Sequence, residues 1–352
     1  MPDVTVASAI RAAAAAFAQA GVASPMNDAR LLMSYALNSP EGGDNDEVPR
    51  AASFSDVFLA GDEPSPNIYD DWARRRAYRE PLQHIVGATN FFGYDFHCAP
   101  GAFIPRPETE LLVEWALQQT IQDIELTDSS ELTRGLHPGT ITIVDLCSGP
   151  GTIGLSVAAG LASYLKNRRE QPGQSDAVAW LRTVRIIGVE IDEVAVELAE
   201  RNAAQFRRDG LLGSDVEISF IRGDVRDDKL LPRHGLVAEA QYVLANPPYV
   251  PDDGEVDRET IADPAHAVFS GTDGMELMPH VIRQAALAAA PHARIAVEHD
   301  DATGPHTCAE LSALGPDQVL QGSIEQHQDL AGRDRFVTGT IQRDPGFVPQ
   351  RP

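Results

Sequence analysis

The sequence predicts an α/β fold with a mostly parallel, Rossmann-like sheet and a smaller helical domain ahead of it. Strand patterns alternate with helix patterns from about residue 140 onward, and such alternation yields parallel strands covered by helices on both faces. A glycine-rich stretch directly follows the first strand, where such folds bind nucleotide-containing ligands. A length of 352 residues and a hydrophobic content of 43% leave room for a second domain.

The N-terminal 88 residues are expected to form a helical domain. An alanine-rich helix is predicted at residues 6–20, and Ser24 and Pro25 suit the N-cap and first position of a second helix. Residues 40–68 are rich in Gly, Pro, Ser, Asp and Glu, which predicts a long, mobile acidic loop. A third helix is expected at residues 72–78, with a basic, solvated face formed by Arg74, Arg75, Arg76 and Arg79.

An aromatic β-hairpin is expected to link the domains. Between residues 83 and 104, aromatic residues alternate around Gly93, and the pattern ends at Pro100 and Gly101. This predicts a helical, substrate-docking domain at residues 1–88, a hairpin linker at 89–104 and a catalytic domain at 105–345.

Charge and cysteine content disfavour several classes of protein. The formal net charge is −24 and the pI is about 4.7; binding to a phosphate backbone rests on Lys and Arg, so no stable nucleic-acid partner is expected. The three cysteines lack the spacing of a zinc site or a CxxC pair, so we expect no metal and a reducing, cytoplasmic location. No segment approaches the roughly 18 consecutive apolar residues of a membrane span. We expect a monomer without a membrane partner.

The catalytic part begins with a rigid, proline-bracketed turn at residues 104–110, which leads into a helix at 111–117. Strands are expected at residues 140–145, 184–189, 216–221, 242–245, 293–298 and 335–340. Helices are expected at 153–165 and 194–206, and a polar insertion at 167–180. Ligands of open α/β sheets bind at the carboxyl ends of strands, so the residues after each strand are the site candidates.

The first candidate is the glycine loop, residues 147–151, which opens a G-x-G-x-x-G pattern between a strand and a helix. Glycines there let a ligand approach the backbone closely. Glu190, at the end of the next strand, is placed to hold ribose hydroxyls; it follows Gly151 by 39 residues (190 − 151), against a usual spacing of about 20. Asp224, after the third strand, suits an adenine amino group. A nicotinamide-dependent dehydrogenase would share these features.

The second candidate is Asn246-Pro247-Pro248-Tyr249, called the clamp below, which follows the strand at residues 242–245. The Asn246 oxygen and the Pro247 carbonyl are two acceptors for the two N–H bonds of a planar amino group. Two consecutive prolines stiffen the strand end, and the Tyr249 ring can cover the flat face of the bound group. Hydride transfer has no need of such a clamp, whereas methyl transfer to a conjugated nitrogen does.

The combined motifs resemble the HemK family, the bacterial protein-glutamine N5-methyltransferases that modify the Gly-Gly-Gln loop of peptide chain release factors. The shared blocks occur in the same order and span most of the chain from about residue 74, at residues 79–87, 103–110, 145–151, 246–249 and 332–340. The Asn-Pro-Pro-Tyr motif alone is shared with adenine-N6 methyltransferases, but its combination with the turn at 104–110 is more specific.

This resemblance implies a class I S-adenosylmethionine-dependent methyltransferase with a seven-stranded, mostly parallel sheet. The implied cofactor residues are Asp145, Cys147, Ser148, Gly149, Pro150, Gly151, Glu190 for the ribose, Asp224 and Val225 for the adenine, and Asn246. The implied substrate residues are Asn246, Pro247, Pro248, Tyr249, Phe103 and Arg106, with Arg106 alternatively a structural partner of Glu108 or Glu110. Two features depart from the family or its loop chemistry: Cys147 stands where glycine is common, and Pro150 removes one loop N–H.

The expected reaction needs alignment more than acid–base chemistry, because a carboxamide nitrogen is a weak nucleophile. Catalysis is assigned to Asn246, Pro247 and Tyr249, which hold the amide and favour the positive charge that develops on nitrogen. His84 and His299 are expected to be structural. The alternatives are a glutamine methyltransferase acting on a ribosomal protein, an adenine-N6 nucleic-acid methyltransferase, and a non-catalytic binding module.

Overall fold

The computed structural model describes residues 4–39, 47–126, 139–171, 178–316, 318–320 and 322–342. The chain forms two compact units. The first comprises Met1–Ile104 and Glu255–Pro264, and the second comprises Pro105–Gly254 and Ala265–Pro352. Residues 255–264, expected from the sequence to belong with the catalytic part, therefore group with the first unit.

The first unit contains the expected helices. They are α1 (Val6–Gln19), α2 (Pro25–Leu37), α4 (Asn67–Ala77) and α5 (Leu82–Val86). Thr5 caps α1 by accepting a hydrogen bond from the backbone N–H of Ser8, and Pro25 occupies the first turn of α2. Their apolar faces meet in one core that includes the fully buried Phe17 and Leu32.

The prediction of one long loop over residues 40–68 is wrong in its second half. Residues 40–46 lie outside the described residues, but α3 (Phe54–Leu59) and the 3₁₀ turn η1 (Ala60–Asp62) follow them. Ser53 and Asp56 form a capping box, in which each side chain bonds the backbone N–H of the other. This pattern is visible in the sequence and identifies the start of the helix.

The prediction of a solvated basic face on α4 is wrong for Arg76 and Arg79, although Arg74 is exposed as expected. Arg76 is buried and pairs with Asp28 at 2.8 Å and with Glu259 at 2.9 Å. Glu259 also accepts from Arg79 at 2.6 Å, and the hydrogen bond with Arg79 is the main reason that the pKa of Glu259 falls to about 2. The returning segment 255–264 is thus tied to α4 by ion pairs within the first unit.

The expected hairpin is present as β1 (Ala88–Phe91) and β2 (Tyr94–His97), which pair antiparallel. Its two turn residues, Phe92 and Gly93, have φ values of 52° and 78°. Two positive φ values are typical of a type I′ turn, whose twist matches that of the paired strands.

The second unit is built on the expected seven-stranded, mostly parallel sheet. In sheet order, the strands are β5 (Val216–Arg222), β4 (Thr183–Glu190), β3 (Thr140–Leu146), β6 (Ala240–Ala245), β7 (Ala289–Glu298), β9 (Asp334–Thr340) and β8 (Glu325–Gln328). The first five are parallel, whereas β9 and β8 each run antiparallel to their neighbour.

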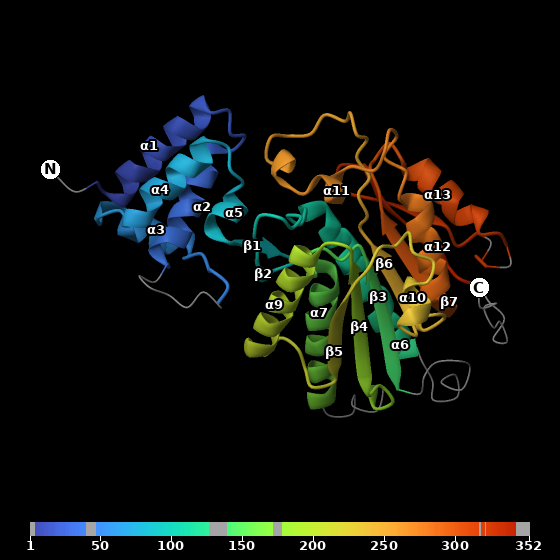
Figure 1. The fold of residues 1–352 in the computed structure, drawn as a ribbon. Helices are drawn as coiled ribbons and strands as arrows, with labels where there is room; N and C mark the ends of the chain where they lie inside the picture. Colours follow the sequence, from blue (N-terminus) through green and yellow to red (C-terminus); the bar gives the residue numbers. More distant parts are fainter. Residues whose placement is uncertain are drawn as a thin grey trace. The chain divides into compact units, whose positions relative to one another are not determined.

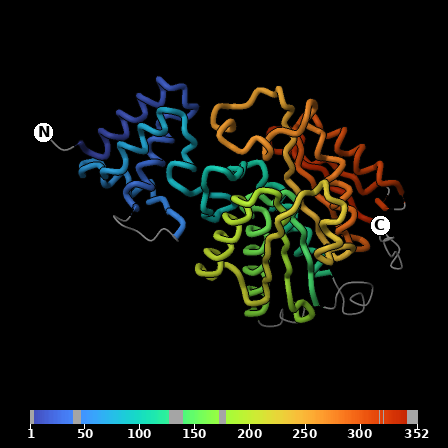
Figure 2. Tube along the Cα trace, viewed as in Figure 1, coloured from blue at the N-terminus to red at the C-terminus, as the bar shows by residue number. Residues whose placement is uncertain are grey.

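Helices cover both faces of this sheet (Figure 1). One layer consists of α6 (Glu110–Leu126), α7 (Thr152–Glu170) and α9 (Glu193–Arg208); the other consists of α10 (Leu230–Arg233), α12 (Met278–Ala288) and α13 (Gly304–Ala313). Figure 2 follows the chain through these layers, from green β3 and α7 to yellow β6 and orange α12. Strand residues alternate between the layers: Val144 and Leu146 join the core beneath α12, whereas Asp145 accepts from the N–H of Gly154 on α7.

Several elements of the second unit were not located from the sequence. These are α10, α12, α13, strand β8 and the short helix α11 (Ala265–Val268). Both α12 and α13 carry a proline in the first turn, at Pro279 and Pro305, which is a start signal available in the sequence. The expected insertion at 167–180 is helical as far as Glu170, and residues 172–177 lie outside the described residues.

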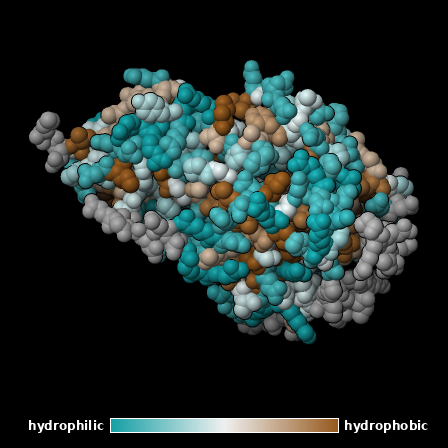
Figure 3. Space-filling view, viewed as in Figure 1, coloured by the Kyte–Doolittle hydropathy of each residue, from teal (hydrophilic) through white to brown (hydrophobic). Residues whose placement is uncertain are grey.

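Among the described residues, no helix is long and apolar enough to cross a membrane. On the face shown in Figure 3, apolar surface occurs in patches separated by hydrophilic surface.

Candidate active site

The two candidate motifs lie at neighbouring strand ends. β3 and β6 are adjacent and parallel, with Leu146 paired to Ala245. The glycine loop follows Leu146 directly, and the clamp follows Ala245 directly. The strand order reverses between β3 and β6, and such a switch point opens a crevice at the carboxyl edge of an open α/β sheet.

The glycine loop turns sharply through left-handed conformations. Cys147, Gly149 and Gly151 have φ values of 58°, 52° and 81°, a conformation that favours glycine, although the first of these positions carries Cys147. A Cβ on Gly149 would meet nothing within 4 Å, whereas one on Gly151 would lie 2.9 Å from the Phe220 ring. Gly149 therefore leaves open space for a ligand, and Gly151 makes room for the packing of β5.

Two buried polar atoms beside this loop have no hydrogen-bond partner among the described residues. They are Oδ1 of Asp145 and Oγ of Ser148. The pKa of Asp145 is raised to about 7, chiefly by burial and also by the negative charge of Glu190, while the N–H of Gly154 opposes the rise. An unpaired buried acceptor costs free energy, so the site suits a ligand that brings hydrogen-bond donors.

Glu190 lies at the carboxyl end of β4 and holds the glycine loop. One of its oxygens accepts from the N–H of Gly149 at 2.8 Å, and the other accepts from Ile191 and Asp192 at 2.8 and 2.9 Å. Burial raises the pKa of Glu190, and these three hydrogen bonds oppose the shift. The oxygen that accepts from Gly149 retains acceptor capacity for a ligand hydroxyl, whereas the other already accepts two hydrogen bonds.

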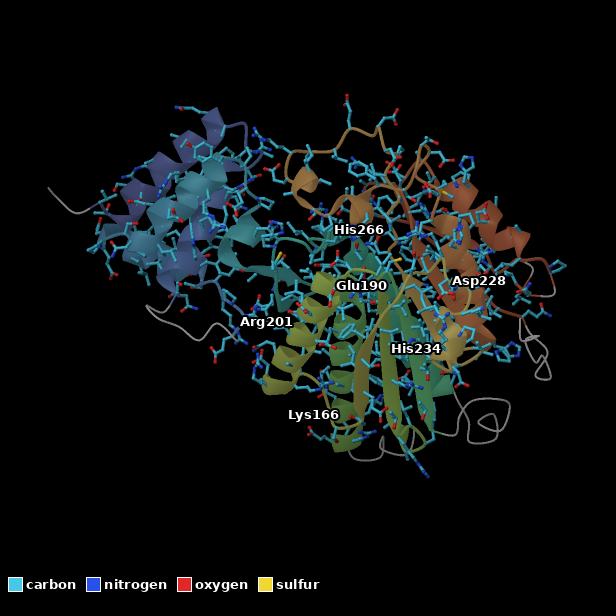
Figure 4. The ribbon with its side chains drawn as sticks, viewed as in Figure 1. Lys166, Glu190, Arg201, Asp228, His234 and His266 are labelled. Atoms are coloured by element: carbon cyan, nitrogen blue, oxygen red, sulfur yellow. The ribbon has the colours of Figure 1, made fainter. Side chains whose placement is uncertain are left out.

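A surface pocket of about 290 Å³ lies beyond Glu190 and is lined by Ile191, Asp192, Glu193, Arg222 and His266. Figure 4 shows Glu190 at the edge of the sheet, with His266 above it. His266 approaches Asp192 at 3.1 Å, an ion pair when the imidazole is protonated. His266 was not identified from the sequence, because nothing local distinguishes it from a surface histidine.

Asp224 follows β5, as expected, but its carboxylate is engaged within the chain. It accepts from the side chain of Arg226 at 3.1 Å and from the backbone N–H of Arg226 at 2.9 Å. Burial works to raise the pKa of Asp224, but the hydrogen bonds and charge of Arg226 prevail and lower it. The Val225 side chain is buried in the core. The adenine role of both residues stays a prediction.

The clamp is held at both ends. Asn246 follows β6, and Val250, immediately after the clamp, forms a parallel bridge with Phe269. Gly274 lies against the backbone of Tyr249 with a φ of 75°, and a Cβ there would come within 2.2 Å of the Tyr249 carbonyl oxygen. Position 274, in the loop after Phe269, therefore has no room for a side chain next to the clamp.

A hydrogen-bond network through the buried Thr109 and Glu298 joins the two polar residues of the clamp. The Asn246 Nδ2 donates to Thr109 Oγ1 at 3.1 Å, and Thr109 Oγ1 in turn donates to Glu298 Oε1 at 3.1 Å. Tyr249 donates its hydroxyl to the same oxygen of Glu298 at 3.3 Å. Burial, reinforced by the charge of Glu298, raises the pKa of Tyr249, so its phenol stays protonated.

The sequence did not identify Thr109 and Glu298 as site residues. Glu298 ends β7, so the rule that sites gather at carboxyl strand ends applies to it as it does to Glu190. Thr109 lies in the proline-bracketed turn, where only the fold reveals its contact with Asn246. His299, next to Glu298, bonds Gln326 and the Asp300 carbonyl instead.

The two remaining substrate candidates belong to different units. Arg106 lies in the second unit, where its positive charge lowers the pKa of Tyr249 against the larger effect of burial. Phe103 belongs to the first unit, and its role stays a prediction. Within the described residues, no group of His, Cys, Asp and Glu could hold a metal ion.

Comparison with known proteins adds independent findings. Residues 8–87 match the family model described as the PrmC N-terminal domain. The release factor glutamine methyltransferase of Corynebacterium glutamicum is 34% identical over 336 residues, covering 95% of this chain and 98% of that protein. The protein of the same name from Mycolicibacterium smegmatis is 35% identical over 95% of this chain and 96% of its own length.

Two further matches are more distant. The 4-amino-L-phenylalanine/4-methylamino-L-phenylalanine methyltransferase of Streptomyces pristinaespiralis is 29% identical over 82% of this chain and 78% of that protein. Among solved structures, the Thermus thermophilus 16S rRNA N2 G1207 methyltransferase in complex with AdoMet and guanosine is 15% identical, with a TM-score of 0.42, over 73% of this chain and 50% of that chain.

Proposed function

This chain belongs to the release factor glutamine methyltransferase family, and we propose that it methylates N5 of the glutamine in the Gly-Gly-Gln motif of peptide chain release factors. The observation that carries the proposal is the position of the glycine loop and the clamp on adjacent strand ends at the switch point of the sheet. A methyl donor and a planar amide can meet there. The enzyme would act in the cytoplasm, where translation terminates.

We assign S-adenosylmethionine as the methyl donor, and the residues around the glycine loop fit it. Gly149 faces open space, and Ser148 Oγ and Asp145 Oδ1 lack partners among the described residues. Glu190 would accept from the ribose hydroxyls, and Asp224 with Val225 would meet the adenine. When bound, the cofactor supplies an electrophilic methyl group on a positively charged sulfur.

The clamp would prepare the substrate amide for attack. Asn246 Oδ1 and the Pro247 carbonyl accept its two N–H bonds, which fixes the nitrogen in line with the methyl group and draws its lone pair out of conjugation. The same oxygens favour the positive charge that develops on nitrogen. Pro248 holds the turn, and Tyr249 covers the amide face. The proton can leave after transfer, so no dedicated base is required.

The test is mass spectrometry of release factors incubated with the protein and S-adenosylmethionine. The expected product carries one added methyl group, located by fragmentation on the glutamine of the Gly-Gly-Gln motif. Methylation of a ribosomal protein alone would replace this substrate with the first alternative. Absence of any methylated protein would contradict the proposal.

A second candidate is methylation of a small aromatic amine, favoured by the 29% identity with the 4-amino-L-phenylalanine methyltransferase. An aniline nitrogen is also planar and conjugated, so the clamp could hold it. Parallel assays with 4-amino-L-phenylalanine and with a release factor distinguish the two candidate functions, because only the preferred substrate should saturate the enzyme at low concentration.

A further inference from the structure

The clamp can work only if the Asn246 carboxamide points its oxygen toward the substrate. An asparagine side chain presents an oxygen on one side and an NH₂ group on the other, and rotation by half a turn exchanges them. A flipped Asn246 would place donors against the substrate N–H bonds. Something in the protein must therefore choose between the two orientations.

Thr109 makes this choice through its single hydroxyl proton. Its oxygen lies 3.1 Å from Asn246 Nδ2 and 3.1 Å from Glu298 Oε1. An ionised carboxylate can only accept, so the hydroxyl proton must go to Glu298, and the Thr109 oxygen is left as an acceptor. Only the Nδ2 side of Asn246 can then face Thr109.

Glu298 also fixes the second polar residue of the clamp. Tyr249 donates to the same oxygen, so one carboxylate aligns both Asn246 and Tyr249. Glu298 and Thr109 are buried, at 3% and 2% exposure, so the hydrogen bond between them is shielded from water, whereas the bonds to Asn246 and Tyr249 are partly buried. Burial disfavours the charged form of Glu298, and the hydrogen bonds from Thr109 and Tyr249 offset part of that cost.

We propose that Glu298 and Thr109 are positioning residues that orient the Asn246 carboxamide, so that its oxygen faces the substrate amide. This proposal rests on the proposed function, because it explains how the same clamp is made selective for an N–H donor. It adds two residues that contact neither substrate nor cofactor.

The arrangement makes the orientation dependent on pH. The pKa of Glu298 is raised to about 7, chiefly by burial and also by the charge of Glu108, while Thr109, Tyr249 and Arg335 oppose the rise. Protonated Glu298 can donate to Thr109, which frees the Thr109 proton for Asn246 Oδ1 and permits the flipped state. The productive orientation is therefore favoured as the pH rises through about 7.

The first test compares Thr109→Val with Thr109→Ser, using S-adenosylmethionine and a release factor. Thr109→Val removes the hydroxyl and should lower kcat at least about tenfold with cofactor KM within about twofold. Thr109→Ser restores the hydroxyl and should return kcat to within about threefold of wild type. Thr307→Val is the matched control: Thr307, on α13, is as buried as Thr109, but its hydroxyl donates to the backbone carbonyl of Thr303. Wild-type kcat in Thr109→Val would overturn the proposal.

The second test uses Glu298→Gln, which is isosteric and folds without burying a charge. In wild type, kcat should rise between pH about 6 and about 8.5, and Glu298→Gln should remove that rise. An identical pH profile in the two proteins would overturn the proposal, since a purely structural residue would not shift it.

A third readout needs no substrate. In nuclear magnetic resonance spectra, the Asn246 side-chain NH₂ should be protected from exchange in wild type and Thr109→Ser, and unprotected in Thr109→Val. Protection without methylation of a release factor would reject the proposed function and keep the positioning role. Equal protection in all three proteins would reject the positioning role alone.

Discussion

The glycine loop and the clamp lie side by side on β3 and β6, yet they are held in different ways. Around the glycine loop, missing side chains set the geometry: on the neighbouring strand β4, a Cβ on Gly188 would lie 2.5 Å from Phe220 and 2.8 Å from Ser148 Oγ. At the clamp, the geometry is set by a hydrogen-bond network around the buried Glu298. Substitutions around the glycine loop should therefore act through steric conflict, and substitutions at the clamp through loss of side-chain orientation.

The largest effect is expected at Gly188, on β4 beside the glycine loop. Gly188→Ala should cost about 2–3 kcal/mol of stability, because the new methyl group collides with Phe220 beneath the loop. Chemical denaturation and calorimetric titration with S-adenosylmethionine measure the loss. Adding Phe220→Leu to Gly188→Ala should restore part of the lost stability. Wild-type stability of the Gly188→Ala protein would contradict the close packing of Phe220 on Gly188.

At the clamp, Asn246→Ala should leave the fold and the cofactor affinity nearly intact. It should lower kcat at least about tenfold, roughly 1.4 kcal/mol of barrier, because one of the two amide acceptors is lost. Single-turnover assays with a release factor measure the rate, and calorimetry measures cofactor binding. An unchanged rate would remove Asn246 from the catalytic role.

Glu190 shares features of both regions. It lies beside the glycine loop, but like Glu298 it acts through hydrogen bonds, because its carboxylate accepts from three backbone N–H groups. Glu190→Gln keeps the shape but replaces one acceptor with a donor, and should weaken S-adenosylmethionine binding about fivefold. Glu190→Ala should weaken it more and also destabilise the loop, since three N–H groups lose their partner. Wild-type affinity in calorimetry for both variants would count against the ribose role.

The smallest effect concerns the pH dependence of stability from Asp145. Its pKa rises from 3.8 to about 7 on folding, chiefly because of burial. The stabilisation is therefore complete at pH below its unfolded pKa and is lost as the pH rises through about 7. Between pH about 5 and about 8, wild type should lose at least about 1 kcal/mol relative to Asp145→Asn. Parallel thermal unfolding curves of the two proteins over this range would contradict the shift.

The sequence predicted the fold well where local patterns are strong. The parallel strands were found because each is a short apolar run followed by a turn signal, as at residues 140–146 and 242–245. Strand β8, Glu-Gln-His-Gln, was not located because it has no apolar pattern, and only its pairing with β9 makes it a strand. Arg76 was misread as solvated, because its partners Asp28 and Glu259 lie far away in the chain.

The sequence by itself determined the two motifs, their order, and their places after strands, because a turn and its neighbouring strand are local. It indicated a loop for a nucleotide-containing cofactor and a clamp for a planar amide. Only the tertiary structure decided what holds the clamp in register. Thr109, Asn246 and Glu298 are separated by more than a hundred residues in total, and the sheet brings them within hydrogen-bond distance. Such a network has no sequence pattern, because its geometry comes from the order of the strands.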